Sequence, residues 1–110
     1  MITKVITQRN WETAKINEEI NEASLKEEGF IHCSFLEQAL KVAGKYFSQE
    51  EDVLLLTIDP ILLKADIKYE LASNGQEYPH VYGVINIESI VEVIPFHKEK
   101  GEFILREVQR

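Results

Sequence analysis

Two short apolar segments of this sequence carry side chains that are suited to binding an anion. His32 and Ser34 lie in the run GFIHCSF, and His80 and Tyr82 lie in the run PHVYG. Imidazole and phenol groups donate hydrogen bonds, and imidazole changes its charge near neutral pH. We therefore expect the two segments to contribute to a site for a phosphate or another oxyanion.

The alternation of side chains along a strand determines which of these groups can act together. In the first segment Phe30, His32 and Ser34 share one face, whereas Cys33 points to the other. Adjacent His32 and Cys33 therefore cannot form a nucleophile and base pair, which requires a hydrogen bond between them. Cys33 is predicted to be a buried core thiol, since free cysteine is among the most buried residue types.

In the second segment His80 and Tyr82 share a face, so His32 and His80 are predicted to meet across a sheet. Ser34 followed by Glu37 has the form of a helix capping box, which would bring a positive helix end to the same pocket. His32 and His80 are the candidate catalytic residues. The predicted ligand-binding residues are His32, Ser34, Glu70, His80 and Tyr82.

Two other interpretations of the histidines are open at this stage. A metal site can be drawn from His32, His80 and Glu70, but the sequence has no close His–Cys ligand pair, so no metal is predicted. Both histidines are equally compatible with structural roles in the fold. The third histidine, His97, lies in a charged turn and is expected to be solvated.

Composition limits the class of protein. The 110 residues are 45% hydrophobic and 28% charged, which predicts one folded domain over residues 1–110. A net charge of −7 argues against a general nucleic-acid binder and against binding to anionic membranes. No segment has the length of a membrane span or the apolar core of a signal peptide, so a cytoplasmic protein is expected. The expected partner is a small molecule, and the sequence does not determine the oligomeric state.

The hydrophobic pattern predicts an α+β fold, with about six strands in a mainly antiparallel sheet and two main helices, because strands and helices do not alternate regularly. Residues 53–58 read as a central strand that is covered on both faces, and residues 2–6 as a half-buried strand. Further strands are expected at residues 67–71, 79–87, 90–94 and 103–105. Helices are expected around Trp11 and after Ser34, the second with a stripe of Leu36, Ala39, Leu40, Ala43, Tyr46 and Phe47.

Motifs along nearly the whole chain resemble the bacterial domain of unknown function 952 family. The matching residues are Trp11, Ser24-Leu25, Glu28-Gly29-Phe30-Ile31-His32-Cys33-Ser34, Gln38-Ala39, Tyr69-Glu70 and Pro79-His80-Val81-Tyr82-Gly83. The GFIHCS and PHVYG runs are specific when they occur together and in this order.

This resemblance implies a compact fold similar to ADP-ribosyltransferases and RNA 2′-phosphotransferases, which hold NAD or a related nucleotide in a cleft. His32 would then line the ligand pocket, and His80 would enter it from a later strand. Those enzymes carry a His or Arg in the first strand, where this chain has only Thr3 and Lys4. They also commonly carry a late-strand acid, a position that Glu70 fills only if its strand reaches the cleft.

Three functional hypotheses follow from these residues. The chain is a transferase-like or phosphotransferase-like enzyme, a noncatalytic module that binds a small ligand in the same cleft, or an interaction protein whose histidines are structural. The relative positions of His32 and His80 distinguish a shared site from two separate residues, because catalytic groups must lie within reach of one ligand.

Overall fold

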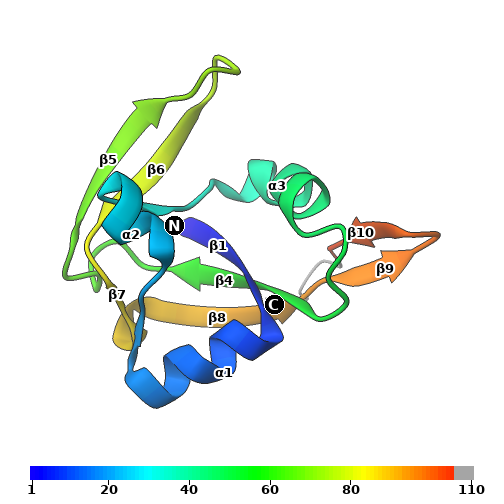
Figure 1. Ribbon diagram of the computed structural model, residues 1–110, viewed down its shortest axis with the longest axis horizontal. Coiled ribbons are helices and arrows are strands. Elements are labelled where there is room, and N and C mark those ends of the chain that lie inside the picture. The colour runs from blue at the N-terminus through cyan, green and yellow to red at the C-terminus, as the bar shows by residue number, and fades with distance from the viewer. Residues whose placement is uncertain (106–110) are drawn as a thin grey trace.

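The computed structural model describes residues 1–105 and shows a compact α+β domain (Figure 1). Its helices are α1 (Gln8–Asn17), α2 (Ala23–Glu28) and α3 (Ala39–Tyr46), with 3₁₀ turns η1 (Leu36–Gln38) and η2 (Ile87–Ser89). The longer strands are β1 (Ile2–Thr7), β4 (Val53–Ile58), β5 (Asp66–Leu71), β6 (Glu77–Tyr82) and β8 (Ile90–Pro95). The shorter strands are β2 (Glu19–Ile20), β3 (Ile31–His32), β7 (Ile85–Asn86), β9 (His97–Glu99) and β10 (Glu102–Ile104).

A central antiparallel sheet has the strand order β1-β4-β8. The middle strand β4 has the sequence VLLLTI, and its side chains enter two different hydrophobic clusters. Leu54 and Leu56 pack in one cluster with Trp11, whereas Val53 and Leu55 pack in the other with α3. The prediction of a strand covered on both faces is therefore confirmed.

The first strand differs from its prediction. All six residues of β1 are buried, although the alternating pattern predicted a half-buried strand. Thr3 pairs with Ser34 through two backbone hydrogen bonds of 2.8 and 2.9 Å, and their hydroxyl oxygens lie 2.9 Å apart. Because the polar residues of β1 find partners inside the protein, the strand can be buried on both faces.

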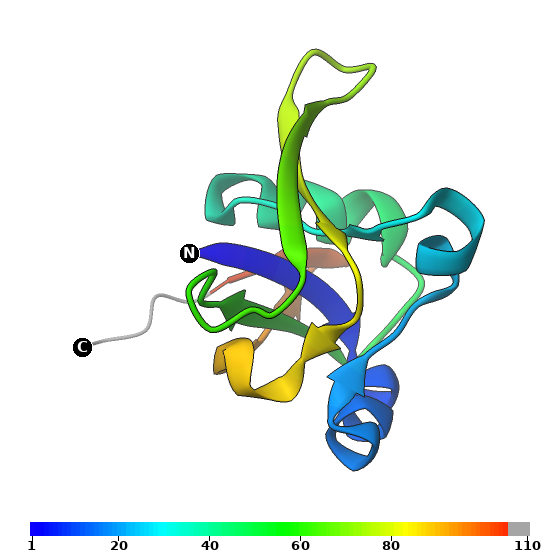
Figure 2. The same ribbon diagram turned by 90° about the vertical axis from the view of Figure 1, so that its left-hand side faces the viewer.

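A second antiparallel sheet has the order β3-β6-β5 and includes a hairpin that projects from the rest of the domain (Figure 2). The predicted strand 79–87 is wrong as a single strand. It is divided at Gly83 into β6 and β7, and β7 pairs with β2 instead. Gly83 has a φ of 158°, and a Cβ at this position would lie 2.9 Å from the Cβ of Ala65. A side chain there would clash, so the strand can change sheets at this point only with glycine.

The helix after Ser34 also begins differently from its prediction. The capping box of Ser34 and Glu37 is wrong, because Gln38 Oε1 accepts the Phe35 N–H at 2.9 Å and the chain first forms the 3₁₀ turn η1. The predicted stripe is buried only in part. Ala39 and Ala43 are fully buried, whereas Leu36, Leu40 and Tyr46 are exposed. Two small residues, together with the partly buried Val42, therefore pack α3 against the sheet.

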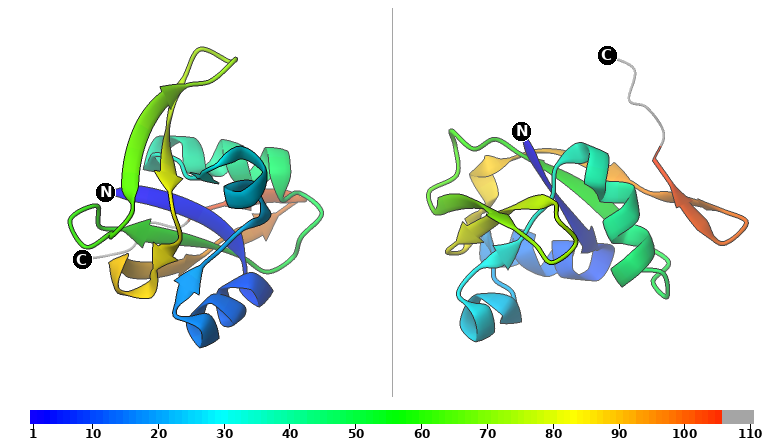
Figure 3. Two further views of the ribbon diagram at one scale, coloured as in Figure 1. Left: turned by 60° about the vertical axis from the view of Figure 1, so that its left-hand side comes forward. Right: turned by 90° about the horizontal axis from the view of Figure 1, so that it is seen from above.

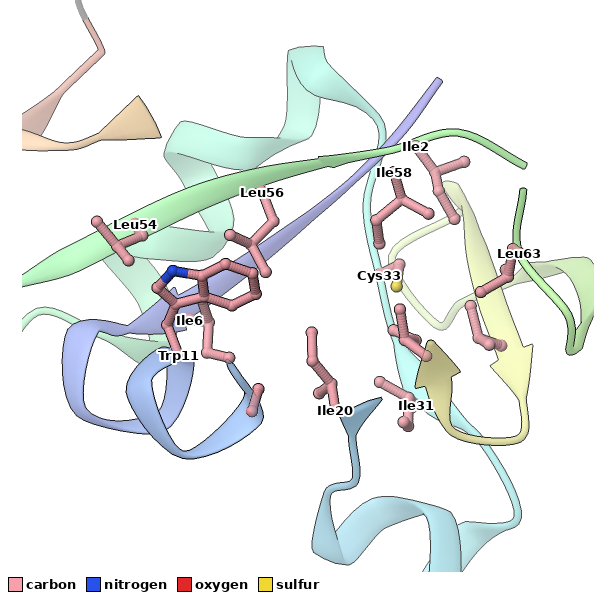
Figure 4. Packing of buried hydrophobic residues seen from close by; sticks show 13 residues of the cluster. Ile2, Ile6, Trp11, Ile20, Ile31, Cys33, Leu54, Leu56, Ile58 and Leu63 are labelled. Carbon is pink, nitrogen blue, oxygen red and sulfur yellow. The ribbon is translucent and has the colours of Figure 1, made fainter. Parts of the chain in front are cut away.

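The larger core cluster joins the two sheets and α1 (Figure 4). Trp11 packs near Leu54 and Leu56. Ile31 and Val81 anchor β3 and β6 by their inner faces. Ile31 and Val81 are opposite each other in the sheet register and are both fully buried. Their burial fixes which residues of β3 and β6 face outward, and His32 and His80 are the next pair in that register.

Candidate functional site

His32 and His80 lie directly opposite each other on neighbouring antiparallel strands. Their ring centroids are 5.5 Å apart, with an interplanar angle of 80°. Both residues line one cleft. Side chains that are about 5 Å apart on one sheet face are close enough to contact the same small molecule.

Phe30 orders this pair from the same sheet face. Its ring stacks on His80 at a centroid distance of 4.0 Å and contacts the edge of His32 at 4.9 Å. Strand alternation placed Phe30 on this face, but Phe30 was not among the predicted site residues. Its position two residues before His32 is the signal that could have identified it.

Glu70 in β5 holds His80 from the side opposite β3. Glu70 Oε1 lies 2.8 Å from His80 Nδ1, and Tyr82 donates its hydroxyl to the same oxygen at 2.5 Å. The Tyr82 bond, followed by the His80 bond, keeps the pKa of the Glu70 carboxyl below its ordinary value. The same bond to Glu70 raises the pKa of the Tyr82 phenol. This cluster therefore contains an ionised carboxylate and a protonated phenol at neutral pH.

His32 is more exposed than His80, since 54% of its side chain is accessible compared with 14% for His80. Its Nε2 lies 3.1 Å from Glu28 Oε2, at the end of α2. Its backbone carbonyl accepts a hydrogen bond from Lys4 Nζ at 2.8 Å. The ammonium of Lys4 also forms a 2.7 Å ion pair with Glu22. A buried cation of β1 is thus attached to the backbone of the strand that carries His32.

The cleft has a volume of about 890 Å³ and is surrounded by segments that are distant in the sequence. Figure 3 shows α2, α3 and the β5–β6 hairpin arranged around β1. The cations that line the cleft are Lys4, Lys41 and Lys45, and the acids are Glu19 and Glu22. With the two histidines, basic groups are therefore more numerous than acidic groups in the lining.

The predicted site residues do not all face this cleft. Ser34 is among the lining residues, but it is 2% exposed and its hydroxyl contacts Thr3. Glu70 and Tyr82 lie behind His80 and are not part of the lining. The face of the Tyr82 ring is occupied by Lys68 Nζ, 4.7 Å from the ring centroid. This face of the Tyr82 ring is therefore not free to stack on a ligand ring.

The helix start after Ser34, Tyr78 and His97 also differ from what the sequence predicted. The helix start after Ser34 does not line the cleft, because only Lys41, Val42 and later residues of α3 do so. Sequence reasoning missed Tyr78 as a lining residue, although it is two residues before His80 on the same face of β6. His97 begins β9 and is exposed, instead of lying in a turn.

Cys33 lies on the core side of its segment, as strand alternation predicted. Its side chain packs among apolar residues that include Ile2 and Ile58 (Figure 4). Burial raises the pKa of the thiol from 9.0 to about 12, so the thiol is protonated at neutral pH. A protonated, buried thiol is a poor nucleophile.

Within residues 1–105, no cluster of three or more His, Cys, Asp or Glu side chains has the arrangement needed to hold a metal ion. No helix in the same residues is long and apolar enough to cross a membrane.

These features define a class of small α+β domain in which two histidines on neighbouring strands line a cleft. Residues 5–93 match the model of the family described as protein of unknown function (DUF952). The chain belongs to this family, as its GFIHCS and PHVYG runs indicated. No curated protein matches the chain.

Three solved structures to which the chain is similar are of the same protein, CC0527. The chain is similar to the crystal structure of protein CC0527 from Caulobacter crescentus, with 27% identity, a TM-score of 0.84, and coverage of 94% of this chain and 92% of that one. A crystal structure of a double mutant of CC0527 has 26% identity, a TM-score of 0.83 and the same coverage. The solution NMR structure of CC0527 has 26% identity and a TM-score of 0.78, and it covers 93% of this chain and 89% of that one.

Proposed function

We propose that the protein binds a small phosphorylated ligand of nucleotide size in the cleft, with His32 and His80 at one end and Lys4 on its floor. The observation that supports this function is a cleft of about 890 Å³ that combines a cross-strand histidine pair with a buried lysine. Ligand sites in proteins commonly measure 300–1,000 Å³ and carry a few convergent polar groups.

Lys4 supports an anionic ligand most directly. A lysine ammonium has three N–H donors. Two are used by the His32 carbonyl and by Glu22, and Lys4 has no further hydrogen bond within residues 1–105. Since Lys4 lines the cleft while only 7% of its side chain is exposed, the third donor is available to a bound anion. Charged side chains are almost never buried this deeply unless they are paired with another group.

The local charge of the cleft supports the same ligand class. The chain has a net charge of −7, which repels polyanions at long range. Inside the cleft, three lysines and two histidines face two glutamates. A concave surface with this lining attracts a small anion even though the whole protein is acidic.

We further propose that the ligand is a nucleotide of the NAD type. The enzymes that the family is expected to resemble carry a His or Arg in the first strand, and Lys4 is the basic residue that β1 of this chain offers instead. Glu70 in β5 bonds to His80 but does not line the cleft, so it can act on a bound ligand only through His80. NAD, ADP-ribose and mononucleotides are accordingly the first ligands to test.

Thermal shift and isothermal titration measure this binding. A ligand at about 100 times its dissociation constant should stabilise the folded state by about 2.7 kcal/mol. Lys41→Ala and His80→Ala should each raise the dissociation constant of the nucleotide at least tenfold. His97→Ala is the matched control, because His97 is exposed and does not line the cleft. If no nucleotide shifts the wild-type protein, and His80→Ala only lowers its stability, the histidines are structural and the proposal is wrong.

A further inference from the structure

The hydrogen bond between Glu70 and His80 determines which ring nitrogen carries the proton. An ionised carboxylate only accepts hydrogen bonds. Glu70 is ionised at neutral pH, because its bonds to Tyr82 and His80 hold its pKa below the ordinary value. His80 Nδ1, at 2.8 Å from Glu70, must therefore be the donor. In the neutral imidazole the lone pair then lies on Nε2.

Nε2 of His80 is open to the cleft. It makes no hydrogen bond within residues 1–105, and it is not among the buried polar atoms that lack a partner. His80 itself lines the cleft. The stack on Phe30 at 4.0 Å and the bond to Glu70 hold the ring in one orientation. A fixed imidazole with a free lone pair is arranged to accept a proton from a bound water.

His32 supplies a second imidazole beside the first. Its ring is 5.5 Å from that of His80, and its Nε2 is held by Glu28. The side chain is 54% exposed, so its proton can be replaced from solvent. The charged and titratable groups next to the two rings are Glu28 from α2, Glu70 and Lys68 from β5, and Tyr82 from β6.

We propose that the cleft hydrolyses a phosphodiester bond of its ligand, with His80 as the general base and His32 as the general acid. This inference rests on the proposed function, because the lysines must first bind the phosphate. A water oxygen forms a new bond to phosphorus and gives its proton to His80 Nε2. The bond from phosphorus to the leaving sugar oxygen breaks, and that oxygen takes a proton from the His32 imidazolium. Proton exchange with solvent then restores both rings.

Two imidazoles match this reaction because the entering and leaving oxygens lie on opposite sides of phosphorus. One group must accept a proton while another donates one, since a sugar alkoxide is a poor leaving group. Glu70 acts through His80 and is a positioning residue. Its expected effect is to maintain the Nδ1–H tautomer of the ring.

Two substrates separate the roles of the histidines. Hydrolysis of 2′,3′-cyclic AMP releases a sugar hydroxyl, whereas bis(4-nitrophenyl) phosphate releases a nitrophenolate that needs no proton. His80→Ala and His80→Gln should lower kcat about 100- to 10,000-fold on both substrates. His32→Ala should have an effect of that size on 2′,3′-cyclic AMP and less than about a tenfold effect on bis(4-nitrophenyl) phosphate. His97→Ala should leave both rates unchanged.

The tautomer of the His80 ring can be measured directly. Nitrogen-15 NMR of the His80 ring should show a proton on Nδ1 in the wild-type protein. Glu70→Gln should give a mixture of tautomers and lower kcat more than about tenfold, whereas a purely structural role would leave the tautomer unchanged. Circular dichroism shows whether each variant is folded. If His80→Ala does not fold, His80→Gln replaces it in the assays.

The outcomes distinguish a failure of catalysis from a failure of binding. If the wild-type protein binds nucleotides but hydrolyses neither phosphodiester, catalysis is excluded and binding stands. Turnover that survives His80→Gln would contradict the role of His80. If the protein neither binds a nucleotide nor hydrolyses a phosphodiester, both proposals are wrong.

Discussion

Lys4 is a buried lysine whose removal should leave two groups of the cleft without their partner. Its ammonium forms an ion pair with Glu22 and donates to the carbonyl of His32. Removing one member of a buried pair commonly costs 3–5 kcal/mol, because the other charge is left uncompensated. Glu22 is 31% exposed, so water recovers part of this cost. We therefore expect Lys4→Met to lower the free energy of unfolding by about 2–4 kcal/mol.

The double variant separates the ion pair from the loss of packing. In Lys4→Met with Glu22→Gln no charge is left alone, so the double variant should be about 1–2 kcal/mol more stable than Lys4→Met by itself. Urea denaturation followed by the fluorescence of Trp11, the single tryptophan, measures each variant.

An exposed ion pair on α1 provides the control for this cycle. Lys15 and Glu12 are 3.0 Å apart, with about half of each side chain accessible. Lys15→Met should therefore change the stability by less than about 0.5 kcal/mol. The reasoning is refuted if Lys4→Met has an equally small effect, or if the effects of the two single substitutions simply add in the double variant.

Three further predictions test other parts of the structure. Gly83→Ala should lower the free energy of unfolding by about 1–3 kcal/mol, because the added methyl group would clash with Ala65. Gly44→Ala lies in an open helical position and should raise the free energy of unfolding by about 0.5–1 kcal/mol. Thermal denaturation compares the two variants. Burial holds the pKa of the Cys33 thiol at about 12 in the folded protein, against 9.0 for a free thiol, so the thiol should make stability fall by up to about 1.4 kcal/mol per pH unit as the pH rises between those values. Cys33→Ala should lose this contribution, and urea titrations of both proteins at several pH values measure the difference in slope. Tyr82→Phe should move the pKa of Glu70 up toward its ordinary value, since the Tyr82 bond is its main cause, and a carbon-13 NMR titration detects this change.

Strand alternation predicted the inner and outer faces of the β3–β6 pair. It placed Cys33 in the core and brought His32 opposite His80, because one face of each strand is fixed by buried apolar residues such as Ile31 and Val81. The apolar run in β4 was equally informative, since both faces of that strand are covered. These features depend only on the local pattern and on which face is buried.

The remaining features depend on partners that are distant in the sequence. Lys4 looked like the polar face of a strand, and only the folded chain brings it to Glu22 and to the His32 carbonyl. The Ser34 hydroxyl contacts Thr3 instead of capping a helix, because β1 lies beside it. Ala65 lies close against Gly83, which is likewise a contact between residues that are distant in the sequence. No local pattern reports such contacts, so the cleft could be anticipated at its histidine end but not along its floor.

The pairing of β1 also has a consequence for the folding kinetics. This strand, at the start of the chain, pairs with β4 at Thr3 and Thr57 and is bridged to Ser34, so its contacts close long loops. Chains dominated by such contacts reach the transition state slowly, because loop entropy is lost before the contacts form. The lysine floor of the cleft forms only after β1 docks. We therefore expect a refolding chain to gain ligand affinity in the same kinetic phase that buries Trp11, with no earlier species able to bind.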